Sequence, residues 1–278
     1  MRYILLFIAI FTFSCKYNIS SPVGTIKDYS ANSGKLFYTS SNDKTNDIET
    51  TLMKNKHSLG IYKIVVLGGD STTILTNIKA ALDKNLSFDN VEIDLSLTKI
   101  TNIPKNMFTN TTNLGKITLP DTVTNIEEKA FSGCYSLNSI RFPNNLENIS
   151  DGAFSNCSSL TLVMLSSDAL TNISGNAFYG CSSLQNLVLP ANISNVCDTA
   201  FSGCSQLKNI EYLGTNTNVN GSPFASSNLK GNNSNPTDLY LPSATNTTIS
   251  NYFSGKSFLG KTWSNDNIHT KKHIPYNK

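Results

Sequence analysis

The chain has 278 residues, of which 39% are hydrophobic and 15% charged, and its formal net charge is +3. This length allows one or two domains. So small a positive surplus argues against a nucleic-acid partner, because proteins that bind nucleic acids concentrate basic residues on one face.

Residues 1–14 have the pattern of an export signal. Arg2 supplies the positive start, and residues 4–13 form an apolar run that is too short to cross a bilayer as a helix. Ser14 then precedes Cys15, which looks like a bacterial lipoprotein signal of the loose spirochaetal kind, with Thr12 in place of the usual leucine. We therefore predict lipidation at Cys15 and a membrane contact through that lipid. The alternative is an ordinary secretory signal with an incidental cysteine.

Residues 15–34 are polar, rich in Ser, Asn and Gly, and without a periodic apolar face. This composition predicts a tether between the anchor and the folded part of the chain.

Residues 35–90 change to a mixed pattern that predicts an N-terminal capping region. We expect a short helix over residues 47–56, a strand over 61–67 and an amphipathic helix over 71–84. With a strand over 91–97, these segments form a βαβ unit that covers the first coil of the following region.

Gly68 and Gly69 stand between the expected strand and helix, where a phosphate-binding loop could lie. The spacing of glycines, lysine and hydroxyl residues that such loops require is absent. We therefore predict a plain turn and no cofactor.

The centre of the chain repeats a unit in which Ala-Phe is followed three residues later by Cys. The spacings of its Phe residues are 154−131 = 23, 178−154 = 24 and 201−178 = 23. Weaker copies lie at Phe108 and Phe224, with Thr111 and Ser227 in the Cys position. A fixed period in this range predicts a solenoid. The four clear copies are Ala130-Phe131 with Cys134, Ala153-Phe154 with Cys157, Ala177-Phe178 with Cys181, and Ala200-Phe201 with Cys204.

Each unit also contains Leu-x-x-φ-x-φ, where φ is apolar, and this alternation predicts a strand. A proline ends the strand at Pro120, Pro143 and Pro190, and the last copy reaches its final apolar position one residue late, at Leu213. An aliphatic residue four positions before each Ala is expected to pack inward: Ile126, Ile149, Ile173 and Val196.

Both patterns resemble the BspA-type leucine-rich repeats of bacterial surface proteins, over residues 91–242. The resemblance implies an α/β leucine-rich-repeat solenoid with a parallel concave sheet and Ala-Phe turns on the convex side. It also implies a surface adhesin that binds host extracellular-matrix or bacterial surface proteins. Leu213 and the missing proline after Leu165 depart from the pattern and affect only strand ends.

Residues that alternate with the buried positions of each strand face outward from the sheet. Leu162, Met164 and Val188 would form an apolar stripe, which is either a contact site or a set of scattered surface residues. Six strands span about 25 Å, enough for a protein patch or an extended peptide. The predicted ligand-binding residues of the concave face are Lys116, Thr118, Ser139, Arg141, Leu162, Met164, Asn186, Val188, Asn209, Glu211, Asp238 and Tyr240.

The four cysteines of the repeats would lie in a row about 5 Å apart. Buried free thiols are the favoured interpretation, with disulfides between neighbouring coils as the alternative. A metal site is disfavoured, because no CxxC pair or histidine accompanies the row. Cys197 lies outside the row and is expected to be a core variant of its coil.

No catalytic constellation is recognisable. The histidines are few, and His269 and His273 have helical spacing but precede Pro275, so a metal pair there is disfavoured. Glu127, Glu128 and Asp121 have no matching partner cluster and are expected on a solvated face. We predict a protein that is not an enzyme and holds no metal.

Residues 243–278 are expected to close the solenoid. Tyr252, Phe253, Phe258 and Trp263 would form an aromatic C-terminal cap, and residues 269–278 a mobile basic tail. The whole chain is thus predicted to be a monomeric, lipid-anchored protein-binding module at the outer surface of the cell envelope. The alternative is a structural scaffold protein facing the periplasm.

Overall fold

The computed structural model describes residues 36–216, 219–224, 238–243, 257–259, 261–263 and 265–271. All of them belong to one compact unit, which spans Gly34–Lys278. The predicted signal and tether lie outside the described residues, as do Cys15, Ser227, Tyr252, Phe253 and His273.

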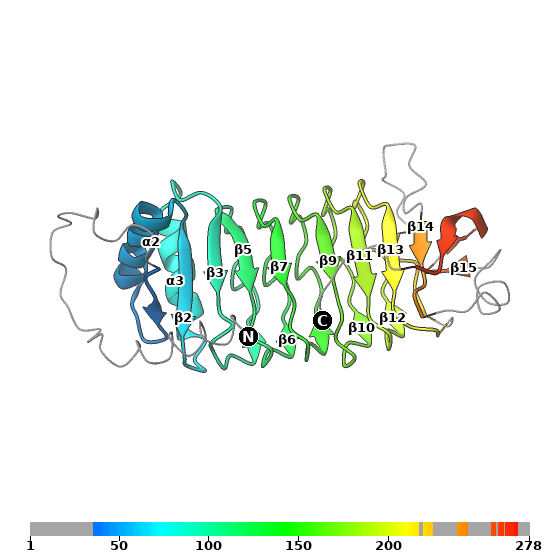
Figure 1. Cartoon of the computed structure of the whole chain (residues 1–278), viewed down its shortest axis with the longest axis horizontal. Helices are drawn as coiled ribbons and strands as arrows, with labels where there is room; N and C mark the ends of the chain where they lie inside the picture. The colour runs from blue at the N-terminus through cyan, green and yellow to red at the C-terminus, as the bar shows by residue number, and fades with distance from the viewer. Residues whose placement is uncertain are drawn as a thin grey trace, which may run out of the picture. The chain divides into compact units, whose positions relative to one another are not determined.

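Two helices and three parallel strands precede the repeats (Figure 1). Strands β2 (Lys63–Leu67) and β3 (Val91–Asp94) pair in parallel with α3 (Thr73–Lys84) between them, which confirms the predicted βαβ cap. Helix α2 (Thr45–Leu59) is longer than expected and ends at Gly60, whose φ of 76° is the left-handed conformation that glycine adopts readily. Strand β1 (Thr39–Ser40) pairs in parallel with β2 and adds a second βαβ unit that the sequence did not predict.

The repeats place their long strands side by side, in chain order (Figure 1). They form two parallel sheets, ordered β1-β2-β3-β5-β7 and β17-β14-β13-β11-β9. The prediction of parallel strands is confirmed, and the strands divide into two sheets because β7 and β9 do not pair. The strands are β5 (Leu114–Thr118), β7 (Ser139–Arg141), β9 (Leu162–Met164), β11 (Asn186–Leu189), β13 (Asn209–Tyr212), β14 (Asp238–Tyr240) and β17 (Ile268–His269).

A further parallel sheet, of two-residue strands, was not predicted. Its strands contain the aliphatic residues that precede each Ala-Phe, and these are buried as expected. A pair of residues is too short for alternation to reveal a strand in sequence. The strands are β4 (Asn102–Ile103), β6 (Asn125–Ile126), β8 (Asn148–Ile149), β10 (Asn172–Ile173) and β12 (Asn195–Val196).

The Phe residues of the repeats form a stack in the core. Ring centroids of neighbouring coils are 5.3, 5.0, 5.1 and 5.1 Å apart from Phe108 to Phe201, with planes within 9° of parallel. The fixed period brings the same side chain to the same place in every coil, and stacked rings at this spacing attract each other.

Asn113 joins the cap to the first coil. Its buried side-chain amide donates hydrogen bonds to the main-chain carbonyls of Leu82 (3.0 Å) and Asn85 (3.2 Å). These carbonyls lie at the end of α3 and also accept from main-chain amides, Leu82 from Asn85 (3.3 Å) and Asn85 from Phe88 (3.0 Å).

The far end is closed by a short hairpin, β15 (Ser257–Phe258) and β16 (Lys261–Thr262), followed by the 3₁₀ turn η3 (Asn265–Asn267) and β17. Phe258 and Trp263 are buried, which confirms these two members of the aromatic cap. His269 belongs to β17, so the prediction that the mobile tail begins there is wrong. The buried Ile268 pairs with Leu239 and extends the sheet instead. No helix within the described ranges has the length and apolar character needed to cross a membrane.

Candidate protein-binding face

Outward positions of the long strands form two rows across the sheets, which we call the long-strand face. The strand register sets these rows, because equivalent residues of neighbouring coils lie directly beside each other. The first row is Lys63, Glu92, Lys116, Ser139, then Leu162, Asn186, Asn209, Asp238. The second row is Asp94, Thr118, Arg141, then Met164, Val188, Glu211, Tyr240, His269.

Ten of the twelve predicted residues are at least partly accessible. Lys116 and Arg141 are exposed, and the others are half-buried: Thr118, Ser139, Leu162, Met164, Asn186, Asn209, Asp238 and Tyr240. The expectation is wrong for Val188 and Glu211, which are both 0% exposed. The two residues lie beside each other on β11 and β13, with Met164 and Tyr240 on either side of the pair. The exposed apolar stripe is therefore reduced to Leu162 and Met164.

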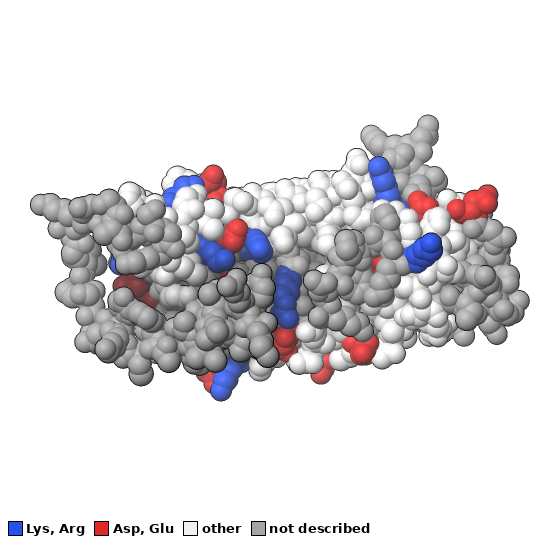
Figure 2. Space-filling model, viewed as in Figure 1, with Lys and Arg blue, Asp and Glu red and all other residues white. Residues whose placement is uncertain are grey.

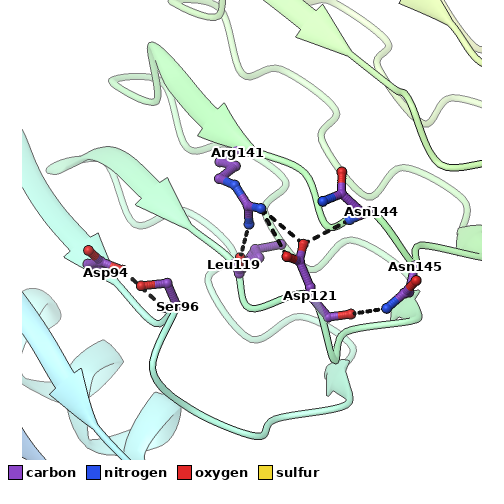
Figure 3. A network of polar contacts seen from close by, with 7 residues as sticks. All are labelled: Asp94, Ser96, Leu119, Asp121, Arg141, Asn144 and Asn145. Atoms are coloured by element: carbon purple, nitrogen blue, oxygen red, sulfur yellow. Dashed lines mark hydrogen bonds and ion pairs between the residues drawn. The ribbon is translucent and has the colours of Figure 1, made fainter. Parts of the chain in front are cut away.

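Arg141 is bound to the turn of the preceding coil (Figure 3). Its guanidinium donates to both carboxylate oxygens of Asp121 at 3.1 Å and to the main-chain carbonyl of Leu119 at 3.0 Å. The next loop approaches the same turn, because the amide of Asn144 donates to the Asp121 carboxylate and the Asn145 side chain donates to the Asp121 carbonyl.

The network affects the ionisation of Asp121. Partial burial raises the pKa of this carboxyl, but hydrogen bonds from Asn144 and Arg141 outweigh it and hold the pKa below its ordinary value of 3.8. Asp121 thus stays charged at neutral pH and fixes the direction of the Arg141 side chain. Arg141 offers a partner only the part of its guanidinium that faces solvent.

Amides occupy the next part of the face. The side chain of Asn209 donates to the side-chain oxygen of Asn186 in the neighbouring strand, at 2.8 Å. Leu162 and Met164 lie beside this pair on β9. The surface at these strands therefore combines apolar side chains with uncharged hydrogen-bonding groups.

His269 is a member of the face that sequence reasoning missed. Its Nε2 lies 2.8 Å from a carboxylate oxygen of Asp238, and its ring centroid lies 4.7 Å from that of Tyr240. A lone apolar residue before a histidine is too weak a signal to identify a strand. Glu92 and Asp94 were also missed, although the alternation of the predicted strand over residues 91–97 could have identified them.

Charge is unevenly distributed along the solenoid. Residues 142–207 contain four carboxylates and no lysine or arginine. In Figure 2, charged side chains on the visible face form small scattered groups separated by uncharged surface. The N-terminal half of the long-strand face is thus charged, and the part on β9 and β11 is neutral.

The four cysteines of the repeats are buried, as predicted, and each thiol donates to the Phe carbonyl of the preceding coil. The donor–acceptor distances are 3.0, 3.2, 3.3 and 3.3 Å from Cys134 to Cys204. Burial raises the pKa of Cys134 to about 12. It also raises the pKa values of Cys157 and Cys204 well above the ordinary 9.0. Such thiols are structural hydrogen-bond donors rather than nucleophiles.

Cys197 is half-buried and accepts a hydrogen bond from the Asn195 side chain. None of the described cysteines is joined in a disulfide. Among the described residues, no three His, Cys, Asp or Glu side chains come together in a group that could hold a metal ion.

The strand of the last clear repeat departs from its predicted register. Tyr212, not Leu213, lies opposite Leu189 and is fully buried. Its hydroxyl donates to the main-chain carbonyl of Asn216 at 3.0 Å, which satisfies the polar end of a ring placed in an apolar position.

Comparison with protein families shows what the repeats are similar to. A family model described as a BspA type leucine rich repeat region matches residues 101–230 in six copies. A comparison with curated proteins returned no match.

Several solved structures are similar to parts of the chain. A leucine-rich repeat protein of T. pallidum is 27% identical over 43% of this chain and 57% of its own, with a TM-score of 0.41. A leucine-rich cell surface protein of Faecalibacterium prausnitzii is 28% identical over 45% of this chain and 33% of its own, with a TM-score of 0.43. The pneumococcal vaccine antigen PcpA is 22% identical over 68% of this chain and 42% of its own, with a TM-score of 0.49. The matched regions thus span less than two thirds of each of these solved chains.

Proposed function

Because the repeats over residues 101–230 belong to the BspA-type leucine-rich repeat family, we propose that the chain is a protein-binding module of the bacterial cell surface. The observation that carries this proposal is the composition of the long-strand face. Leu162 and Met164 are half-buried apolar side chains beside the Asn186–Asn209 amide pair. Partly exposed apolar groups bordered by uncharged hydrogen-bonding groups are typical of the centre of a protein interface.

We further propose that the partner is a host extracellular-matrix protein or a bacterial surface protein, so that the module acts as an adhesin. Lipidation at Cys15 would hold it on the membrane, with the folded part at the outer surface. The face has no described group of residues resembling a catalytic site, and the proposed role needs none.

Solid-phase capture tests the binding role. The purified chain is applied to immobilised fibronectin, laminin and collagen, and a Leu162→Lys/Met164→Lys variant is compared with the wild type. We expect the variant to lose at least about tenfold in affinity for a captured protein, because two charges would be desolvated at the interface.

A matched control places the same two charges elsewhere. Tyr135 and Tyr179 are exposed aromatic residues outside the long strands, 49% and 43% accessible. A Tyr135→Lys/Tyr179→Lys variant should bind like the wild type. Unchanged capture by a folded Leu162→Lys/Met164→Lys variant would show that the long-strand face is not the binding site.

Protease shaving of intact cells tests the location. We expect the chain to be cleaved while a periplasmic control protein survives. If both survive and cleavage follows only after the envelope is permeabilised, the chain faces the periplasm and the scaffold alternative holds.

Metabolic labelling with an alkyne fatty acid tests the anchor. The wild-type chain should incorporate the label, and a Cys15→Ala variant should not. A wild-type chain without label, cut at another position, would refute lipidation at Cys15.

A further inference from the structure

The long-strand sheet is interrupted at one step, between β7 and β9. At other steps, the amide before each strand donates to the preceding coil, as Asn138 does to Gly115 (2.9 Å) and Gln185 to Thr161 (2.9 Å). The corresponding hydrogen bond from Thr161 to Asn138 is absent. The amide after each strand donates to the following coil, as Leu165 does to Val188 (3.0 Å). The corresponding bond from Phe142 to Met164 is also absent.

The same two coils remain joined at their short strands and in the core. The short strands β8 and β10 pair in register, Asn148 with Asn172. The Phe154 amide donates to the Ala177 carbonyl at 2.7 Å, and the Cys181 thiol donates to the Phe154 carbonyl at 3.3 Å. The main-chain bonds that are missing at this step are those of the long strands and that from Thr171 to Glu147, the counterpart of the bond from Ser194 to Thr171 (2.9 Å).

Phe142 is the residue that distinguishes this step. Its position is occupied by Leu119, Leu165 and Leu189 in three other coils, and by Tyr212 in the coil of β13. The Phe142 ring packs edge-on against Phe154 of its own coil (5.4 Å, 72°) and reaches Phe178 of the next coil (6.3 Å, 69°). Ring size alone does not separate the strands, because β13 still pairs with β11 and β14 beside the buried Tyr212. Phe142 differs in that its ring touches the Phe stack of two successive coils.

The coil after the break has an additional residue beside β9. From Leu119 to Ile126 the spacing is 126−119 = 7, whereas from Leu165 to Ile173 it is 173−165 = 8. Ser166 stands where other coils have proline. The segment that leaves β9 is therefore longer and less constrained than its counterparts.

We propose that the step between β7 and β9 is a hinge in the long-strand face, held open by Phe142. The short strands and the Phe stack form its fixed side, and the unpaired strands form its moving side. The segment up to Arg141 and the segment that begins with the neutral strands β9 and β11 can then change their relative tilt. The hinge would let one face adapt to partners of different curvature, but it does not depend on any partner being bound.

Amide hydrogen exchange of the full chain tests the hinge. Exchange at Thr161 is compared with that at Gln185, its paired counterpart one coil later, and exchange at Phe142 with that at Leu165. In the wild type we expect the unpaired member of each pair to exchange at least about tenfold faster. In a Phe142→Leu variant, the strands should pair and this ratio should fall towards one.

A Phe201→Leu variant is the matched control. It also replaces a buried phenylalanine ring by leucine, but at a step whose strands are paired. A general loss of stability would raise the exchange rates of both amides in each pair. The ratio of the two rates within one variant therefore reports on the hinge and not on overall stability. Equal exchange of Thr161 and Gln185 in the wild type would overturn the proposal. A ratio that Phe142→Leu leaves unchanged would overturn the role of Phe142.

Discussion

The thiol of Cys134 donates a hydrogen bond to the main-chain carbonyl of Phe108, one coil earlier, at 3.0 Å. This bond links two coils through groups that are otherwise enclosed by apolar side chains. The same relationship recurs at the next three cysteines of the repeats. The cysteines are thus part of the hydrogen-bonding between coils as well as of the core.

Replacing Cys157 by alanine should destabilise the fold by about 1–3 kcal/mol. The change removes a buried side-chain atom and leaves the Phe131 carbonyl without its thiol donor. Urea unfolding followed by circular dichroism would measure the loss. Cys197→Ala is the control and should cost less than about 0.5 kcal/mol, since Cys197 is half-buried and outside the row.

Stability should fall in alkaline solution because of the buried thiols. In the folded chain the pKa of Cys134 is about 12, whereas the ordinary value of 9.0 applies to the unfolded chain. The unfolded state therefore releases protons above pH 9 that the folded state retains, and ionisation favours unfolding. The contribution of the thiol is complete below pH 9 and is lost as the pH rises towards 12, at up to about 1.4 kcal/mol per pH unit.

Urea unfolding in reducing buffer at about pH 8 and about pH 10 would check the pH dependence. The change in the free energy of unfolding between the two pH values is compared for the wild type and for Cys134→Ala. All other titrating groups contribute equally to both proteins. Identical changes would contradict the assignment to Cys134.

Asn113→Ala should loosen the cap. The variant removes two buried side-chain hydrogen bonds, at a cost of about 1–2 kcal/mol, because both carbonyls keep a main-chain donor. We expect faster amide exchange in α3 than in β11. The exposed neighbour Thr112 provides the control, and Thr112→Ala should leave α3 unaffected. If both substitutions change amide exchange in α3 equally, the side chain of Asn113 does not join the cap to the first coil.

Val188 and Leu162 should respond differently to the same charge. Val188→Lys buries an ammonium at a position that is 0% exposed, and should cost more than about 3 kcal/mol. Leu162→Lys can direct its charge into solvent and should cost less than about 1 kcal/mol. Thermal unfolding of the two variants would measure the difference. A tolerated lysine at position 188 would show that this side chain faces solvent after all.

The repeat pattern made the solenoid predictable because a fixed period constrains every coil at once. Ala, Phe and Cys recur with the spacing of one turn, and the aliphatic residue before them is buried in each coil. The βαβ cap was predictable from the amphipathic stripe of α3. The short strands were not, because two residues carry no alternation, and β1 was missed for the same reason.

The face was less predictable than the fold. Alternation along a strand correctly gives the side of the sheet, but not how far a side chain is covered by its neighbours. Val188 and Glu211 are buried although they alternate outward, and alternation carries no information on what covers a side chain in the folded chain. Phe142 fits the apolar pattern as well as leucine does, so it gave no signal of the interruption. The signals in the sequence are the 24-residue spacing from Phe154 to Phe178 and the missing proline after Leu165, which the pattern assigned only to a strand end.

The thiol-to-carbonyl bond also has a direction, always from one coil back to the coil before it. Thr111 occupies the first position in the row, and its buried hydroxyl has no hydrogen-bond partner among the described residues. Beyond that first position each joint uses the same two groups, Cys and Phe, so any coil presents the acceptor that any other coil needs. Deleting or duplicating a whole repeat would recreate the same joint at the new boundary. The solenoid can therefore change length in evolution by whole repeats without new chemistry between its coils.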